Sequence, residues 1–234
     1  MTYVLHYAPD NASMIIRLAL EELGAPYKTM LVDRATRAQD GAAYRRINPA
    51  GLIPALETPD GPIFEAAAIL LWLADRHGAM APTADSPDRA PFLRTLFFVS
   101  NTLHAQMRMT FYPWKYVGDD TTAQAALRRT LQARSTNDMT LPAGLTLLDA
   151  ALAASNANAP SVLHCYAVAL VRWCALYPAG HTDWFDLHDY PTLLGVAQQF
   201  ETRPSAHVAQ AAEGLGPTPF TAPRLPTPPE GTAL

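Results

Sequence analysis

The sequence predicts an α/β N-terminal domain followed by an all-α C-terminal domain. The N-terminal third alternates short apolar runs, typical of strands, with longer apolar segments that end at Gly or Pro. Residues 79–88 are rich in Pro, Ala and Ser without periodicity, which is typical of a linker. Every later segment with a regular apolar pattern is long enough for a helix. We therefore expect domains at residues 1–78 and 89–215.

The N-terminal domain begins with a predicted β-α-β unit and a short helix. The apolar run that opens the chain ends at a Pro, as a strand entering a loop does, and Gly24 and Pro26 end the first helix. The expected strand, helix, strand and short helix lie at residues 3–7, 14–23, 27–32 and 42–47. Arg17 and Glu21 lie four residues apart on the first helix, and we expect them to pair on its solvent-facing side.

A β-hairpin and an apolar helix complete this domain. Two short runs, at residues 52–58 and 62–64, flank Pro59-Asp60-Gly61, in which Pro presets φ and Gly accepts a positive φ. Residues 65–77 are rich in Ala and Leu and leave little polar face, so this helix is expected to be covered on most sides. The pattern predicts a mixed sheet with helices packed on it.

The remainder of the chain is predicted to be helical up to a Pro-rich tail. The expected helices lie at residues 90–112, 121–155 with a bend near Pro142, 161–176, 191–202 and 205–213. Residues 216–234 contain six prolines and cannot continue a helix, so they either wrap the surface as an extended tail or are mobile.

The composition excludes several classes of protein. Apolar residues make up 49% of the 234 residues and charged residues only 16%, which is incompatible with intrinsic disorder and suggests that a second copy covers part of the surface. The net charge of −4 disfavours nucleic-acid binding. We expect no membrane span and no secretory signal, because no apolar stretch is long enough and the N-terminus lacks a basic region before an apolar one.

The histidines and cysteines predict neither a metal site nor a disulfide framework. Seven histidines are scattered without ligand spacing, so no metal site is expected. Cys165 and Cys174 exclude a disulfide framework and favour a cytoplasmic protein. They lie nine residues apart on one predicted helix, and we expect inert, buried thiols.

Two motifs in the N-terminal domain resemble the glutathione S-transferase family. N-P-x-G-x-I-P-x-L at residues 48–56 is followed by D-G-x-x-x-E-x-x-A-I-x-x-x-L-A at residues 60–74. T-R-P at residues 202–204 and E-G at residues 213–214 resemble the end of the family's helical domain. The resemblance covers nearly the whole chain. It implies a thioredoxin-like N-terminal domain, glutathione as co-substrate and a homodimer.

The resemblance assigns the glutathione site to two segments. It implies a cis peptide bond before Pro54 that presents the backbone of Ile53 to the cysteinyl backbone of glutathione. It also implies that Glu65 holds the γ-glutamyl ammonium and that Ala66, by its backbone N–H, holds the adjacent carboxylate. Family members usually carry Ser or Thr where this chain has Ala66, so the lost hydroxyl predicts weaker binding or a site adapted to another ligand.

Three residues are candidates for activating the glutathione thiol. Family members place the donor either on a tyrosine of the first strand or in the loop that follows, and here Ser13, Asn11 and Tyr7 remain open in that order. Ser13 and Asn11 would equally serve as N-caps of the first helix. Ala12 corresponds to the position of the cysteine in beta-class members, so a mixed disulfide with the protein is impossible there. In this respect the chain resembles beta- or nu-like bacterial members without the loop cysteine.

The second substrate is expected to bind near the end of the first long helix of the second domain. Arg108, Tyr112 and Trp114 follow the family's lining of that side, and their aromatic and cationic character suits a small apolar electrophile. A further helix begins at Ser161, where the family carries Ser/Thr-x-x-Asp and this chain has His164 in place of the acid. We expect that replacement to weaken the cap of this helix.

These features predict a glutathione transferase that activates the glutathione thiolate for attack on a small apolar electrophile. Two other functional hypotheses remain open. One is a glutathione-dependent disulfide or peroxide reductase, suggested by Asn11 in a loop without cysteine. The other is a non-catalytic binding or interaction protein with the same fold, suggested by Ala66.

Overall fold

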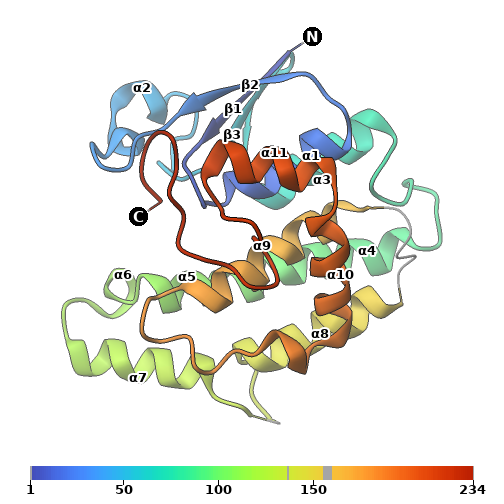
Figure 1. Ribbon diagram of the computed structural model, residues 1–234. Coiled ribbons are helices and arrows are strands. Elements are labelled where there is room, and N and C mark those ends of the chain that lie inside the picture. Colours follow the sequence, from blue (N-terminus) through green and yellow to red (C-terminus); the bar gives the residue numbers. More distant parts are fainter. Residues whose placement is uncertain (1, 136, 155–159, 234) are drawn as a thin grey trace.

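The N-terminal domain contains a four-stranded mixed sheet. The computed structural model describes residues 2–135, 137–154 and 160–233 (Figure 1). β1 (Tyr3–Tyr7) pairs in parallel with β2 (Tyr27–Leu31) and antiparallel with β3 (Ala55–Thr58), which pairs antiparallel with β4 (Gly61–Phe64). The strand order is β2-β1-β3-β4. The expected β-α-β unit and hairpin are therefore present.

Helices cover both faces of this sheet. α1 (Ser13–Glu22) and α3 (Ala66–His77) share the main core with the odd-numbered residues of β1, which project to one face. α2 (Ala42–Arg45) and a 3₁₀ turn (Ala38–Asp40) lie on the other face. Together with the helical second half, this arrangement confirms the thioredoxin-like domain followed by an all-α domain.

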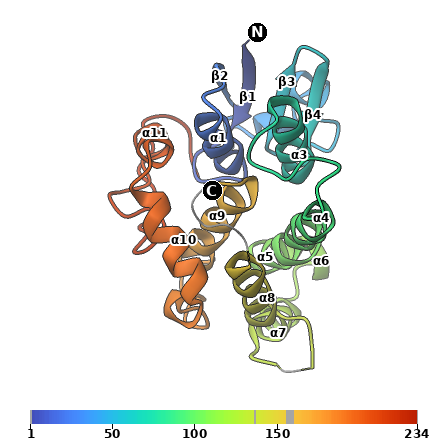
Figure 2. The same ribbon diagram turned by 90° about the vertical axis from the view of Figure 1, so that its right-hand side faces the viewer.

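The C-terminal domain is built around one central helix. α9 (Val162–Leu176) is buried over almost its whole length and contacts α1, α3 and α10 (Figure 2). The surrounding helices are α4 (Arg89–Phe98), α5 (His104–Phe111), α6 (Trp114–Val117), α7 (Thr121–Gln132), α8 (Leu141–Ala153), α10 (Pro191–Glu201) and α11 (Pro204–Glu213). A π-helical segment (Val99–Leu103) joins α4 to α5, and a 3₁₀ turn (Leu187–Asp189) precedes α10. None of the helices formed by the described residues has the length and apolar character needed to cross a membrane.

The expected single helix at residues 121–155 is wrong, because two helices occupy this segment. α7 ends at Gln132 and α8 begins at Leu141. Pro142 lies in the first turn of α8, where proline is favoured because the first N–H groups of a helix have no intrahelical partner. The expected end at Ser155 lies outside the described residues.

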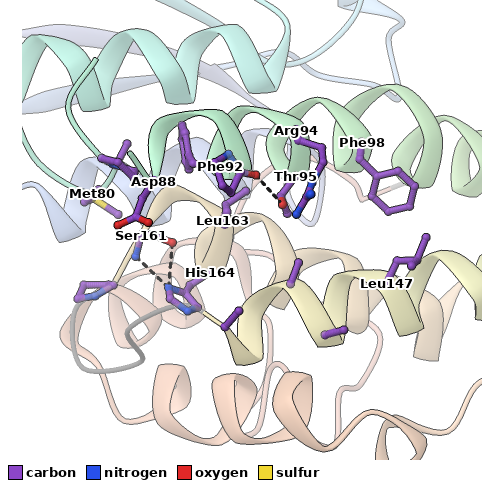
Figure 3. Close-up of a pocket in the computed structure, with 17 residues that line it drawn as sticks. Met80, Asp88, Phe92, Arg94, Thr95, Phe98, Leu147, Ser161, Leu163 and His164 are labelled. Atoms are coloured by element: carbon purple, nitrogen blue, oxygen red, sulfur yellow. Dashed lines mark hydrogen bonds between the residues drawn. The ribbon is translucent and has the colours of Figure 1, made fainter. Parts of the chain in front are cut away.

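The helix cap at Ser161 is preserved by the residue that replaces the expected acid. Nδ1 of His164 accepts a hydrogen bond from the backbone N–H of Ser161 at 2.9 Å and lies 3.0 Å from its Oγ (Figure 3). The expectation of a weakened cap holds only when the imidazole is protonated, because a protonated Nδ1 cannot accept a hydrogen bond. Burial lowers the pKa of His164, and the nearby charge of Arg203 lowers it further.

This cap makes stability depend on pH. In the unfolded chain His164 takes up its proton near pH ~6.5, whereas the folded protein resists it, so stability is present at neutral pH and declines as the pH falls below that value. His164→Gln keeps an acceptor that does not titrate, and we expect it to lose about 1 kcal/mol less between pH 7.5 and 5.5 than the parent. Urea unfolding at several pH values measures this.

A matched control is His207→Gln on the exposed side of α11, which should lose as much stability on acidification as the parent. His104 contributes a loss of the same sign in every variant, because burial and Arg108 lower its pKa to about 4. Equal pH dependence in His164→Gln and the parent would show that the cap does not titrate.

Candidate functional site

The strand register brings four loop segments together at the end of the sheet where β1 and β2 terminate, which we call the sheet edge. The carboxyl ends of the parallel strands β1 and β2 lie at this edge, and so does the start of β3, since His6 pairs with Ala55. Ala55 also pairs with Phe64, which places the end of β4 there. The loops that follow β1, precede β3 and follow β4, together with the one after β2, therefore meet beside one another. The predicted glutathione-site residues lie in these loops or at the adjoining ends of β1, α1 and α3.

The loop before β3 presents an unused peptide unit. The bond between Ile53 and Pro54 is cis, as predicted. Tyr44 and Asn48 both donate to the carbonyl oxygen of Leu52 at 2.6 Å, which holds the loop from α2. Within the described chain, no hydrogen bond engages the backbone N–H or C=O of Ile53. This backbone is therefore available to an extended peptide ligand.

The start of α3 combines backbone strain with exposure. Glu65 is the N-cap of α3 and has φ of 72°, a left-handed value that is unusual for a residue other than glycine. Its side chain is exposed, while Ala66 is buried as the first residue of the helix. Strained residues of this kind concentrate at functional sites. The free N–H groups of the first turn can hold a carboxylate, and the Glu65 carboxylate can hold an ammonium. Together they can bind a ligand group that carries one of each.

The hydroxyl of Ser13 is engaged within the loop. Ser13 is completely buried, and its Oγ donates to the carbonyl oxygen of Ala8 at 3.0 Å and accepts from the Ala8 N–H at 3.2 Å. Neither Ser13 nor Asn11 is the N-cap of α1, because the helix begins at Ser13 and Ala12 occupies that position without a side-chain bond. Ser13 thus closes the loop between β1 and α1.

Asn11 differs from Ser13 in having a free donor. Its Oδ1 accepts from the backbone N–H of Ala12 at 2.8 Å, and its side chain is half-buried. No hydrogen bond of its amide nitrogen occurs within the described part of the chain. The bond to Ala12 fixes the side chain so that the NH₂ group is available to an acceptor outside the loop.

Tyr7 lies at the end of β1 with its hydroxyl covered. The side chain is only 3% exposed and its hydroxyl donates to a carboxylate oxygen of Glu230 in the C-terminal tail. Cζ of Arg17 lies 4.8 Å from the centre of the ring. Burial raises the pKa of Tyr7, and the Glu230 carboxylate raises it further. Tyr7 is therefore a neutral hydroxyl at neutral pH.

Sequence reasoning missed a buried ionic network that holds the loop containing Asn11. The Asp10 carboxylate accepts two hydrogen bonds from Arg172, at 2.8 and 2.9 Å. It also accepts from Trp173 Nε1 at 2.9 Å and from the Tyr177 hydroxyl at 2.7 Å. Both charged side chains are completely buried. An arginine within the apolar run of α9 was the available signal, since a buried charge requires a partner.

A second buried ion pair corrects the expected partner of Arg17. Arg17 is buried and its Nε donates to Glu213 on α11 at 2.7 Å, whereas Glu21 accepts from the hydroxyl of Tyr27. The other carboxylate oxygen of Glu213 accepts from the backbone N–H of Asp10 at 2.8 Å. The expected surface pair of Arg17 and Glu21 is therefore wrong, and Arg17 stabilises the contact between α1 and α11 instead.

The residues predicted to line the electrophile side lie around the end of α5. Tyr112 reaches the sheet edge, because its hydroxyl accepts from Arg34 at 3.2 Å. Its ring meets Trp114 edge-on at 5.5 Å between ring centres and lies 4.9 Å from the Lys115 ammonium. Arg108 donates to the Tyr116 hydroxyl at 3.4 Å. Burial lowers the pKa of Lys115, and so do the charges of Arg108, Arg34 and Arg37, which shows that cations gather here.

A half-buried histidine bonded to a buried tyrosine was also missed. His104 begins α5 directly after the π-helical segment, and its Nδ1 shares a hydrogen bond of 2.8 Å with the Tyr166 hydroxyl. Irregular helical turns of this kind often mark functional positions. Burial raises the pKa of Tyr166, and the charge of Glu65 raises it further, so this pair lies within electrostatic reach of the α3 N-terminus. Nothing in the sequence distinguishes His104 from the other histidines.

One cavity lies away from this edge. It has a volume of about 900 Å³ and lies between α4, α8 and the start of α9 (Figure 3). None of the predicted site residues is among the described residues that line it. Cys165 and Cys174 are buried as expected, and burial raises the pKa of both thiols, which makes them unreactive.

Comparisons with known proteins agree with this geometry. Residues 12–76 match the family model described as glutathione S-transferase, N-terminal domain. A sphingomonad glutathione S-transferase, solved in complex with glutathione, superimposes with a TM-score of 0.71 at 30% identity, covering 91% of this chain and 100% of that one. Glutathione S-transferase GST-4.5 of Xanthomonas campestris is 26% identical over 90% of this chain and 98% of its own length.

Two further relatives carry other names. The disulfide-bond oxidoreductase YfcG of Escherichia coli is 34% identical over 101 residues, which are 40% of this chain and 46% of that protein. Elongation factor 1-gamma 1 of rice is 31% identical over 58% of this chain, which spans only 34% of that longer protein. Because the fold, the sheet-edge motifs and a full-length 30% identity agree, the chain belongs to the glutathione S-transferase family.

Proposed function

We propose that this protein is a glutathione transferase. The convergence of the cis Ile53–Pro54 unit, Glu65 and the loop of Asn11 at one sheet edge carries the proposal. The free backbone of Ile53 would pair with the cysteinyl residue of glutathione, and Glu65 with the first N–H groups of α3 would hold its γ-glutamyl end. The extended cysteinyl residue then directs its sulfur toward the loop that contains Asn11.

In the proposed reaction the Asn11 amide donates to the glutathione sulfur and stabilises its thiolate. The sulfur attacks the electrophilic carbon of a substrate beside Tyr112 and Trp114. A carbon–sulfur bond forms while the bond to the leaving group breaks, and the leaving group departs with the electron pair. The proton of the thiol passes to solvent. Holding the two reactants at adjacent sites supplies part of the rate.

The start of α3 provides a test by gain and loss of glutathione affinity. Ala66→Ser restores a hydroxyl that can donate to the γ-glutamyl carboxylate, and hydrogen bonds to charged groups contribute about 1.5–3 kcal/mol. We therefore expect the Kd for glutathione, measured by calorimetry, to fall about tenfold or more. Glu65→Ala should abolish measurable binding, because the ammonium group loses its counter-charge.

Ala68→Ser is the matched control, since it adds the same hydroxyl on the exposed side of the same helix. Its affinity should equal that of the parent. An Ala66→Ser affinity no better than that of Ala68→Ser would contradict the assigned orientation of glutathione. Absence of binding in the parent and in Ala66→Ser would contradict the transferase proposal.

The second candidate function is a glutathione-dependent disulfide reductase. It is favoured by the likeness to YfcG and by a loop that carries Asn11 and Ala12 without a cysteine. One glutathione thiolate would attack a substrate disulfide, and a second would resolve the mixed disulfide, so that two glutathiones are oxidised and two substrate thiols are released. Faster turnover of a disulfide than of an aryl halide would establish this alternative.

The likeness to elongation factor 1-gamma keeps a non-catalytic binding role as the third possibility. Under that hypothesis glutathione would not change the melting temperature of the protein.

We further expect the protein to be a homodimer, as the low content of charged residues suggests, and sedimentation velocity would measure its oligomeric state.

A further inference from the structure

The Pro-rich segment that follows α11 is anchored on the C-terminal domain. The buried guanidinium of Arg172 donates to the carbonyl oxygens of Leu215, Pro219 and Arg224 at 2.9–3.3 Å. The Glu201 carboxylate accepts from the backbone N–H groups of Phe220 and Thr221. These contacts fix residues 215–227, which we call the root, against the helices.

The following residues cross to the N-terminal domain. In Figure 1 the dark red segment runs from the helical domain up toward the sheet and ends below α2. The hydroxyl of Tyr7 donates to Glu230, and Arg34 donates to the carbonyl oxygen of Ala233. Gly231 packs against Leu31 and Pro9. We call residues 228–233 the tip.

The tip has a glycine where it packs against Leu31 and Pro9. Gly231 has φ of +71°, in the region that favours glycine. A Cβ atom at this position would lie 2.7 Å from Cδ1 of Leu31 and 3.4 Å from Cδ of Pro9. A β-branched residue at position 231 is therefore incompatible with the docked tip.

The partners of the tip are groups that a ligand of the proposed site would use. Tyr7 is one of the three candidate thiol activators, and Pro9 lies in the loop that carries Asn11. Arg34 connects the sheet edge to Tyr112 on the electrophile side. While the tip is docked, the Tyr7 hydroxyl is hydrogen-bonded to the Glu230 carboxylate and Arg34 to the carbonyl oxygen of Ala233. Neither donor is then available to a ligand in these positions.

The tip is held less firmly than the root. Its contacts are a few hydrogen bonds and the packing of one glycine, and Pro229 and Glu230 are exposed. The root contains buried Phe220 and several hydrogen bonds to buried groups. Prolines in the segment limit the freedom gained on release, which favours docking without many contacts. The tip can therefore open while the root remains in place.

We propose that the tip is an autoinhibitory strap that covers the sulfur and electrophile end of the proposed site and is displaced when a ligand binds there. The identity of glutathione as one such ligand rests on the proposed function. The strap itself rests only on the contacts of Tyr7, Arg34 and Gly231.

Two variants release the strap without altering the residues of the site. Truncation after Thr227 removes the tip and leaves the root, and Gly231→Val prevents docking while keeping the full chain. Leu225→Ala is the matched control, since this root side chain is 55% exposed. The first probe is 8-anilinonaphthalene-1-sulfonate, whose aromatic rings and anionic group suit the cluster of Tyr112, Trp114 and Arg34. The second probe is glutathione, measured by calorimetry.

We expect the truncated protein and Gly231→Val to bind the dye about tenfold more tightly than the parent and Leu225→Ala. Dye affinity that is unchanged or lower in both released variants would overturn the strap. If no variant binds glutathione but the released variants bind the dye more tightly, the proposed function fails and the strap stands. If all variants bind glutathione and the dye affinity is unchanged, the strap fails and the proposed function stands.

Discussion

Replacing Arg172 by Met is expected to lower the free energy of unfolding by about 3–5 kcal/mol. The substitution keeps an apolar stem of similar length but removes the guanidinium that pairs with Asp10. Asp10 would then be a completely buried carboxylate with only Trp173 and Tyr177 as donors. Breaking a buried pair from one side is costly because it leaves the other charge without compensation. Urea unfolding followed by circular dichroism measures the change.

Two comparisons isolate the ionic contribution. Arg134→Met removes an arginine from an exposed pair with Asp189, and exposed pairs contribute about 0–1 kcal/mol, so this control should stay near the parent. The double variant Asp10→Asn/Arg172→Met removes both charges and should recover much of the loss. If the double variant is as unstable as Arg172→Met, the bonds from Arg172 to the carbonyl oxygens of the root cause the effect instead.

The network explains why the loop between β1 and α1 has one defined conformation. Asp10 has φ of 48°, which carries a steric cost for a residue with a Cβ atom. Four hydrogen bonds to its carboxylate and one from its backbone N–H to Glu213 stabilise this conformation. Since Asn11 follows directly, helices α9 and α11 determine where its amide points.

The sequence predicted elements whose causes are local. The strand at residues 3–7 and the hairpin turn at Pro59-Asp60-Gly61 depend on neighbouring residues, and the structure places them as expected. The cis bond before Pro54 followed from the family motif, whose spacing is also local in the chain. In contrast, the turn between α7 and α8 contains Ser135, Asn137 and Asp138, which signal a break that a continuous helical interpretation overlooked.

The contacts that the sequence could not predict join residues far apart in the chain. Arg17 had an apparent partner four residues away, yet its carboxylate partner is Glu213. Asp10 and Arg172 pair across 162 residues, and Tyr7 meets Glu230 across 223. Periodicity and spacing report only neighbours along the chain, so these partners require the fold itself. The same limit left Ser13 ahead of Asn11 as the candidate donor until the structure showed that the hydroxyl of Ser13 bonds to Ala8.

Substitution of Asn11 is expected to have the largest effect on catalysis. Asn11→Ala removes the free amide donor, and a hydrogen bond to a charged group contributes about 1.5–3 kcal/mol. The pKa of the bound glutathione thiol should therefore rise by about 1–2 units, and kcat/KM for an aryl halide at neutral pH should fall roughly 10- to 100-fold. The Kd for glutathione should change little, because Ile53 and Glu65 hold the rest of the tripeptide. The ultraviolet absorbance of the thiolate as a function of pH measures the pKa directly.

Asn11→Asp removes the amide donor but preserves the conformation of the loop, because an aspartate can still accept the hydrogen bond from the Ala12 N–H. It lacks the amide donor and adds a negative charge near the sulfur, so its thiol pKa should rise at least as far as in Asn11→Ala. Ser13→Ala breaks the contacts to Ala8 and should mainly lower stability. A raised thiol pKa in Ser13→Ala, with none in Asn11→Ala, would instead establish Ser13 as the donor. The two residues are two positions apart in one loop, so the thiol pKa distinguishes them where sequence position cannot.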